Sequence, residues 1–270
     1  MSDTFVVFEN APYGEHERQR YDLVLPSENA GERGLILFIH GGSWIHGDKA
    51  AYRDDLCLWA EKGFAAAAVN YHYLAPDAHM DTLVSDIALS LSAIRRKAEA
   101  HGVKLGKALL TGSSAGGHLS LLYAYSMAGI SAVRPVCVVD YCGPTLLTDE
   151  KLLFATPEHH PPMEQWIELF TNLCGIPFRP ENREAILAAL TRYSPVTYVS
   201  DASVPTVMVY GMKDDVVPFS NAKALRDGLD AHGIEYVFLP MPEAGHGLEQ
   251  EEIYEESKVL FGMYAERFLR

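Results

Sequence analysis

The sequence predicts an α/β fold in which a mostly parallel central sheet is covered by helices on both faces. Short, continuously apolar runs are typical of strands buried on both faces, and they alternate here with stretches whose apolar residues recur at helical spacing. Such alternation requires crossover connections and therefore parallel strands. The length of 270 residues, without an internal repeat, suits one large α/β domain.

The individual elements follow from these apolar patterns. Two edge strands are expected first, at 5–8 and 21–25. Buried strands are then expected at 34–39, 64–70, 107–111, 136–141, 206–210 and 236–239. Helices are expected at 52–62, around Leu83 to Ile94, from Leu119 to Met127, at 221–232 and at 253–268. The last of these begins in an acidic run, which is favourable at a helix N-terminus.

One region interrupts the alternation of strands and helices. No buried strand is predicted between Pro144 and Pro195, and the segment is too long for a plain crossover. We expect a helical cap at about residues 145–195, folded over the strand ends within a single domain spanning residues 1–270. The alternative is a peripheral decoration away from any site.

Composition excludes several classes of partner. Acidic residues outnumber basic residues, 36 to 22, and the formal charge of −14 disfavours nucleic acid and anionic membranes. No stretch approaches the roughly 20 apolar residues of a membrane span, and no secretory signal is expected at the N-terminus. The four scattered cysteines suggest reduced thiols, so we expect a cytoplasmic protein. The sequence does not indicate an oligomeric state.

The stretch Gly112-Ser113-Ser114-Ala115-Gly116 matches the G-x-S-x-G pattern of a nucleophile elbow. A predicted strand precedes it and a predicted helix follows it, which is the context that gives the pattern meaning. The turn is expected to hold Ser114 in a strained conformation with its hydroxyl outward. Gly112 and Gly116 are expected because a side chain at either position would collide with a neighbouring element. The alternative is an ordinary Gly/Ser turn.

A serine hydroxyl needs a base within hydrogen-bond reach. The candidate base is His246, in a glycine-flanked loop that follows the last predicted strand. Its glycine neighbours let the backbone turn the imidazole toward the site. The other histidines considered are His118 on the elbow helix, His232 on a solvated helix face, and two residues in the expected cap, His159 and His160.

The candidate acid that would orient this base is Asp214, which follows the predicted strand 206–210. Its neighbour Asp215 and the strand-end residue Asp140 are the alternatives. Carboxyl ends of parallel strands are where open α/β sheets place their ligands, so these positions are favourable for a site.

The candidate oxyanion hole consists of the backbone N–H groups of Gly41, Gly42 and Ala115. Glycine at positions 41 and 42 lets the backbone approach a tetrahedral intermediate closely. His40 is interpreted as a structural brace for this loop and not as a catalytic base.

Together these residues resemble the α/β-hydrolase superfamily over almost the full chain. The order Ser114, Asp214, His246 is the order of that superfamily's catalytic triad. More narrowly, the sequence resembles the carboxylesterase/lipase branch related to hormone-sensitive lipase and to kynurenine-formamidase-like bacterial esterases. The motifs that carry this resemblance are His40-Gly41-Gly42-Ser43-Trp44, Gly112–Gly117, Tyr193-Ser194-Pro195, Asp214–Pro218 and Gly245-His246-Gly247.

The sequence differs from many hormone-sensitive-lipase relatives in the first of these motifs. Many of those proteins have a third glycine in the first motif, where this chain has Ser43 followed by Trp44. An aromatic residue near this place is closer to the formamidase-like group. The resemblance implies an α/β-hydrolase fold, Ser114 as nucleophile, Asp214 as acid and His246 as base.

The function hypothesis is hydrolysis of small carboxylic esters through an acyl-enzyme on Ser114, with no cofactor and no metal. The expected partner is a small ester or amide. Four aromatic side chains are expected to line the substrate pocket, although those in the cap could equally form its core: Trp44, Phe154, Trp166 and Phe170. One alternative is an arylformamidase of the kynurenine formamidase type. The other is a non-catalytic small-molecule-binding protein on a hydrolase scaffold.

Overall fold

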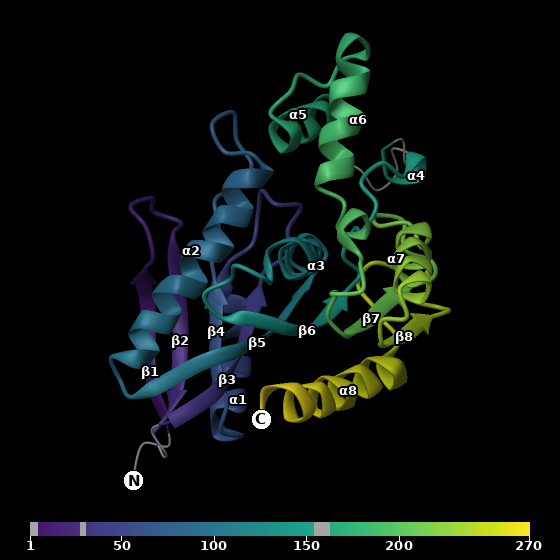
Figure 1. The fold of residues 1–270 in the computed structure, drawn as a ribbon. Coiled ribbons are helices and arrows are strands. Elements are labelled where there is room, and N and C mark those ends of the chain that lie inside the picture. Colours follow the sequence, from purple (N-terminus) through teal and green to yellow (C-terminus); the bar gives the residue numbers. More distant parts are fainter. Residues whose placement is uncertain (1–4, 28–30, 154–162) are drawn as a thin grey trace.

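The fold is an eight-stranded sheet with helices on both faces (Figure 1). The computed structural model describes residues 5–27, 31–153 and 163–270. The strand order is β1-β2-β4-β3-β5-β6-β7-β8. The strands comprise β1 (Phe5–Pro12), β2 (Arg20–Pro26), β3 (Gly31–Ile39), β4 (Ala65–Val69), β5 (Val103–Ser113), β6 (Arg134–Tyr141), β7 (Thr206–Gly211) and β8 (Tyr236–Met241).

The sheet is parallel from β4 to β8 and antiparallel at one end, where β2 pairs with both β1 and β4. The predicted mostly parallel α/β architecture is therefore confirmed. Each predicted strand exists, but β3 and β5 begin three and four residues earlier than expected. At the start of β5, Val103 and Leu105 are buried while Lys104 and Gly106 are exposed, and this alternation extends the pairing with β3 to Gly31.

Helices cover the sheet in two layers. On one face α1 (Arg53–Glu61) packs against β1, β2 and β4, and α8 (Glu251–Leu269) packs against β3 and against β5 to β8. The opposite face carries α2 (Met80–Glu99), α3 (Ala115–Met127) and α7 (Ser220–Ala231). Among the described residues, no helix is both long and apolar enough to cross a bilayer.

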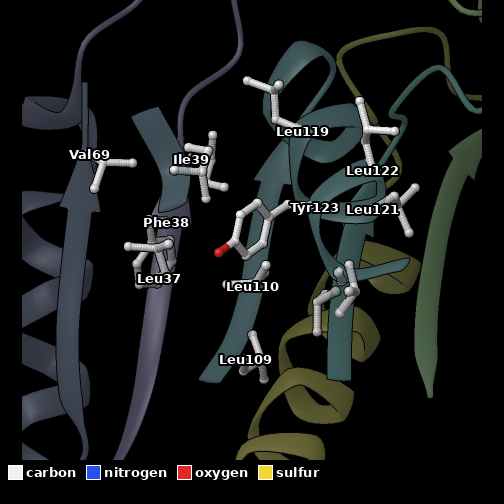
Figure 2. Packing of buried hydrophobic residues seen from close by; sticks show 14 of the residues in the cluster. Leu37, Phe38, Ile39, Val69, Leu109, Leu110, Leu119, Leu121, Leu122 and Tyr123 are labelled. Carbon is white, nitrogen blue, oxygen red and sulfur yellow. The ribbon is translucent and has the colours of Figure 1, made fainter. Parts of the chain in front are cut away.

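The helix α3 lies at the centre of the hydrophobic core. Tyr123 points toward the side of β3 and β5, while Leu121 and Leu122 lie on the other side of the helix (Figure 2). Every residue of α3 from Ala115 to Ala124 is buried, as expected of a helix that is apolar on all sides. Because this burial fixes α3, it also fixes the position of the turn that leads into the helix.

The segment between Pro144 and Pro195 forms helices, and none of its described residues forms a strand. It contributes α4 (Glu150–Leu153), α5 (Met163–Cys174) and α6 (Arg183–Arg192), with short 3-10 turns at Pro180–Asn182 and Pro195–Tyr198. In Figure 1, α5 and α6 stand beyond the ends of the strands. The aromatic rings of Trp166, Phe170 and Phe178 pack together within this segment.

Candidate active site

Ser114 occupies a strained turn between β5 and α3. Its φ of 53° lies in the left-handed region, which a serine rarely adopts. The Ser114 N–H donates to Tyr141 O at 2.8 Å, which anchors the turn to the end of β6. A Cβ at Gly112 or Gly116 would collide with the carbonyl oxygen of Ile39 on β3. These glycines therefore allow the turn to lie directly against the neighbouring strand.

Three predicted side chains form one hydrogen-bonded line. Ser114 Oγ lies 3.0 Å from His246 Nε2, and His246 Nδ1 lies 2.8 Å from Asp214 Oδ2. The three residues follow β5, β8 and β7, respectively, so the sheet brings together positions that are far apart in the chain. A hydroxyl, an imidazole and a carboxylate in such a line have the geometry that nucleophilic catalysis requires.

The Asp214 carboxylate is fixed by its own loop. Its Oδ1 accepts the N–H groups of Val216 at 2.9 Å and Val217 at 2.8 Å, which leaves Oδ2 for His246. The Asp214 side chain is fully buried, whereas the His246 side chain is 25% exposed. A Cβ at Gly211 would lie 2.5 Å from Ala244 O, so this glycine permits the acid and base loops to approach each other.

The alternative acids lie elsewhere. Asp215 is exposed, whereas its neighbour Asp214 is buried. Asp140 is fully buried behind the elbow, where its carboxylate oxygens contact Tyr210 and the Gly143 N–H instead of His246. The structure therefore brings Asp214, and neither of these residues, into contact with the imidazole.

The described alternative bases have side-chain partners other than Ser114 Oγ. His118 is fully buried and bonds Tyr193 O at 2.8 Å through Nε2. Burial lowers its pKa to about 4, so it stays neutral. His232 pairs with Asp201 on the surface. His159 and His160 lie outside the described residues.

Asp140 has an unusual protonation state for a carboxyl group. Burial raises its pKa to about 7. The Tyr210 hydroxyl lies 2.5 Å from Asp140 Oδ2 and 2.6 Å from Gly143 O. A backbone carbonyl only accepts, so the single proton of the Tyr210 hydroxyl is donated to Gly143 O. The hydrogen bond between Tyr210 and Asp140 then requires a proton on the Asp140 carboxyl, which donates to the phenol oxygen. This geometry favours the neutral acid.

Asp140→Asn is therefore expected to gain stability relative to the wild type as the pH rises. Between about pH 4 and pH 7 the unfolded chain releases a proton that the folded protein retains, so the wild-type free energy of unfolding falls with rising pH. The amide does not titrate, and it can still accept from Gly143 and donate to Tyr210. Urea unfolding at pH 5 and pH 8 should show the difference between variant and wild type shifting by about 3 kcal/mol.

The control for this measurement is Asp227→Asn, at a largely exposed carboxylate on α7. Its difference from the wild type should be the same at both pH values. A pH-independent difference for Asp140→Asn would mean that Asp140 is ionised in the folded protein.

The loop after β3 lies against the elbow. A Cβ at Gly41 would be 2.8 Å from Ser113 O and 3.5 Å from Ser114 Cβ. Gly42 has a φ of 106°, and its carbonyl accepts the N–H groups of Ile45 and His46, which closes a tight turn. Ala115 is the first residue of α3, so its N–H has no acceptor within the helix. Gly41 and Gly42 both border the cavity beside Ser114.

That cavity has a volume of about 560 Å³ and is open to solvent. Its floor is the elbow and the loop after β3, and its wall is the first half of α5. The described residues that line it are Gly41, Gly42, Ser43, Ile45, His46, Ser113, Ser114, Cys142, Gln165, Trp166, Leu169, Val216 and His246.

Of the four aromatic residues expected in the pocket, only Trp166 is among these lining residues. Trp44 is buried and donates its indole N–H to His118 Nδ1 at 3.3 Å, because its φ of 60° turns it into the core. Phe170 is also buried, packed between Trp166 and Phe178 inside the cap segment. Phe154 lies outside the described residues.

Sequence reasoning missed the other wall residues. Gln165 and Leu169 flank Trp166 at helical spacing, so the periodicity of α5 could have identified them. Ile45 and Val216 stand in the two loops that carry predicted site residues. No sequence pattern distinguishes them from ordinary core residues.

One group of potential metal ligands exists among the described residues. Cys142 Sγ, one Asp214 oxygen and one His246 nitrogen lie within 4.8 Å of one another. Two of these residues bond each other, and the Cys142 thiol donates to His246 O at 3.6 Å. Burial raises the pKa of the Cys142 thiol well above its usual value, which makes it a poor nucleophile and a poor ligand. The donor set fits a hydrogen-bonded group better than a metal centre.

Comparison with protein-family models identifies the family of this chain. The BD-FAE family model matches residues 21–229. The chain belongs to the BD-FAE family. This range includes the elbow, the loop after β3 and the Asp214 loop of the BD-FAE chain.

Curated relatives of this BD-FAE chain include two kinds of hydrolase. Isoprenylcysteine alpha-carbonyl methylesterase ICME of Arabidopsis thaliana is 26% identical over 235 residues, covering 82% of this chain and 52% of its own length. Kynurenine formamidase of Salmo salar is 27% identical over 184 residues, covering 62% of this chain and 60% of its own length. The chain thus spans little more than half the length of these relatives.

Solved structures establish the fold of the BD-FAE chain. Esterase B from Lactobacillus Rhamnosis superposes with a TM-score of 0.75 at 22% identity, covering 97% of this chain and 85% of that protein. At this identity the likeness shows the fold alone. The α/β-hydrolase fold that the motifs implied is confirmed, as is the resemblance to carboxylesterase-type α/β-hydrolases.

Proposed function

We propose that this protein is a serine hydrolase that cleaves small carboxylic esters. The observation that carries the proposal is the line of hydrogen bonds from Ser114 Oγ through His246 to Asp214, at 3.0 and 2.8 Å. A relative named as a methylesterase supports ester hydrolysis.

The proposed reaction has two steps. His246 Nε2 takes the proton of Ser114 as Oγ attacks the ester carbonyl carbon. The N–H groups of Gly41, Gly42 and Ala115 stabilise the oxyanion, and the leaving alcohol departs with the proton from His246. Water then attacks the acyl-enzyme, with the same imidazole as base, and releases the acid and free Ser114.

The substrate is proposed to be neutral or weakly polar near the scissile bond. Apart from His46, His246 and the Cys142 thiol, no described lining residue of the cavity has an ionisable side chain. Its apolar contacts come chiefly from Ile45, Trp166, Leu169 and Val216.

The four unpaired thiols fit a reducing compartment such as the cytoplasm.

The test is hydrolysis of p-nitrophenyl esters from acetate to decanoate, combined with labelling by a fluorophosphonate. We expect turnover with a kcat/KM at least about tenfold higher for short chains than for decanoate, because the cavity is open to solvent and few of its described lining residues are apolar, so a long acyl chain would gain little contact. Mass spectrometry should locate the label on Ser114. Absence of both turnover and labelling would contradict the proposal and favour a non-catalytic binding protein.

The second candidate is hydrolysis of an aryl formamide. It is supported by the relative named as a kynurenine formamidase, whose identity to this chain is similar to that of the methylesterase. The same three side chains would act, with an amine as the leaving group. Parallel kcat/KM values for p-nitrophenyl acetate and N-formylkynurenine separate the two, since the physiological reaction class should be favoured after correction for the intrinsic reactivity of each substrate.

A further inference from the structure

The loop after β3, residues 40–47 (the oxyanion loop), is held by a side chain from a distant part of the chain. Arg18 lies between β1 and β2, and its guanidinium contacts both ends of this loop. We propose that Arg18 is a positioning residue: it fixes the tautomer of His40, which in turn directs the Gly42 N–H toward the oxyanion. This inference rests on the proposed serine-hydrolase function.

The Arg18 guanidinium makes contacts that only a multidentate donor could make together. Its Nε donates to Tyr71 O at 2.9 Å, and its Nη2 donates to Gly47 O at 3.2 Å. The same Nη2 lies 3.1 Å from His40 Nε2. The guanidinium also stacks 3.7 Å from the centre of the Tyr73 ring, whose hydroxyl donates to Gly47 O. The Arg18 side chain is only 15% exposed, so these contacts define a fixed position.

These contacts determine which nitrogen of His40 carries the proton. Arginine donates and never accepts, so His40 Nε2 must accept from Arg18. Burial, reinforced by the Arg18 charge, lowers the pKa of His40 to about 4, so the neutral ring has one N–H group. That proton is therefore on Nδ1, which donates to Gly41 O at 2.8 Å.

The bond to Gly41 sets the direction of the next N–H group. In a trans peptide the carbonyl and the following N–H point in opposite directions. With the Gly41 carbonyl held on the His40 side, the Gly42 N–H points to the other side of the loop. Gly47, with a φ of 96°, leaves room for this bond, because a Cβ there would lie 2.5 Å from His40 Nδ1.

The other half of the oxyanion loop has a separate anchor. Trp44 O accepts the Leu74 N–H at 3.0 Å, and the Trp44 indole bonds His118. Loss of Arg18 should therefore leave the loop attached at Trp44 while freeing the Gly41–Gly42 peptide to rotate. A freed peptide reduces preorganisation for the transition state and leaves most ground-state contacts intact.

The first arm of the test is independent of catalysis. Imidazole ¹⁵N NMR, with His40 assigned from a His40→Asn spectrum, should show the Nδ1–H tautomer in the wild type. Arg18→Met should move His40 toward the Nε2–H tautomer. The control is Arg20→Met, because Arg20 Nη1 bonds only His16 O and Gln19 O within its own segment and has no hydrogen bond to the oxyanion loop among the described residues. An unchanged His40 tautomer in folded Arg18→Met would overturn the proposal.

The second arm is kinetic. Arg18→Met should lower kcat for p-nitrophenyl acetate by about 10- to 100-fold with KM changed less than threefold, and Arg20→Met should match the wild type. His40→Asn keeps a donor near the Nδ1 position, whereas His40→Gln places its polar atoms near Nε2. His40→Asn should therefore retain at least about tenfold more kcat than His40→Gln, independently of whether Arg18→Met folds. Equal losses in both His40 variants would contradict the tautomer mechanism.

The two arms distinguish failure of this inference from failure of the proposed function. A wild type without esterase or formamidase activity would refute the proposed function, while the NMR arm would still decide whether Arg18 controls His40. An active wild type with unaltered tautomer and kcat in Arg18→Met would refute the inference alone.

Discussion

Ser114→Ala is expected to lower kcat/KM for p-nitrophenyl acetate by at least about 10⁴-fold, to the level of a weak residual activity. Without Oγ no acyl-enzyme can form, and only binding and the oxyanion donors remain to assist attack by water. The measurement is initial hydrolysis rates for wild type and variant at matched concentration. Because Oγ bonds only His246 among the described residues, the variant should unfold within a few degrees of the wild type.

The matched control for this loss is Ser92→Ala on α2, where the hydroxyl bonds, within the part of the chain that the structure describes, only Ala88 O in its own helix. It should keep wild-type kcat/KM. Retention of more than a tenth of the activity in purified Ser114→Ala would show that the observed hydrolysis does not pass through Ser114, and the assignment of the nucleophile would be wrong.

Asp214→Asn is expected to lower kcat by about 10⁴-fold while preserving the fold. The N–H groups of Val216 and Val217 require an acceptor at Oδ1, so the amide nitrogen of the variant must face His246 Nδ1. The imidazole then carries its proton on Nε2 and can no longer accept the Ser114 proton. This loss results from a wrong tautomer and not from a missing contact.

The neighbouring residue provides the control for the acid. Asp215→Asn makes the same chemical change at an exposed position and should stay within about twofold of wild-type kcat. Steady-state kinetics of both variants, with circular dichroism to verify folding, give the comparison. A larger loss in Asp215→Asn than in Asp214→Asn would assign the acid to the adjacent residue.

The sequence was sufficient to predict the order of strands and helices because the parallel strands are continuously apolar. It was less informative where one face of a strand is exposed. Lys104 and Gly106 alternate with buried Val103 and Leu105, so the start of β5 lacks the continuous apolar run that marks its later part. The proposed catalytic residues were recognisable because each stands in a glycine-flanked or strand-end loop.

The pocket and its supports were harder to predict from sequence. An aromatic residue in a loop can face either the cavity or the core, and the positive φ that turns Trp44 inward is a property of the folded loop. Arg18 gave no local signal, since its partners His40 and Tyr71 lie 22 and 53 residues further along the chain. Such contacts exist only after distant segments have come together.

The placement of Ser114, Asp214 and His246 has a consequence for folding experiments. They follow β5, β7 and β8, so β6 must be inserted between the first strand and the other two before the three side chains can meet. The hydrogen-bonded line therefore reports on correct pairing across half of the sheet. Recovery of catalytic turnover after dilution from denaturant is thus a stringent measure of native topology. A partly assembled chain could have most of its helical content and still show no turnover.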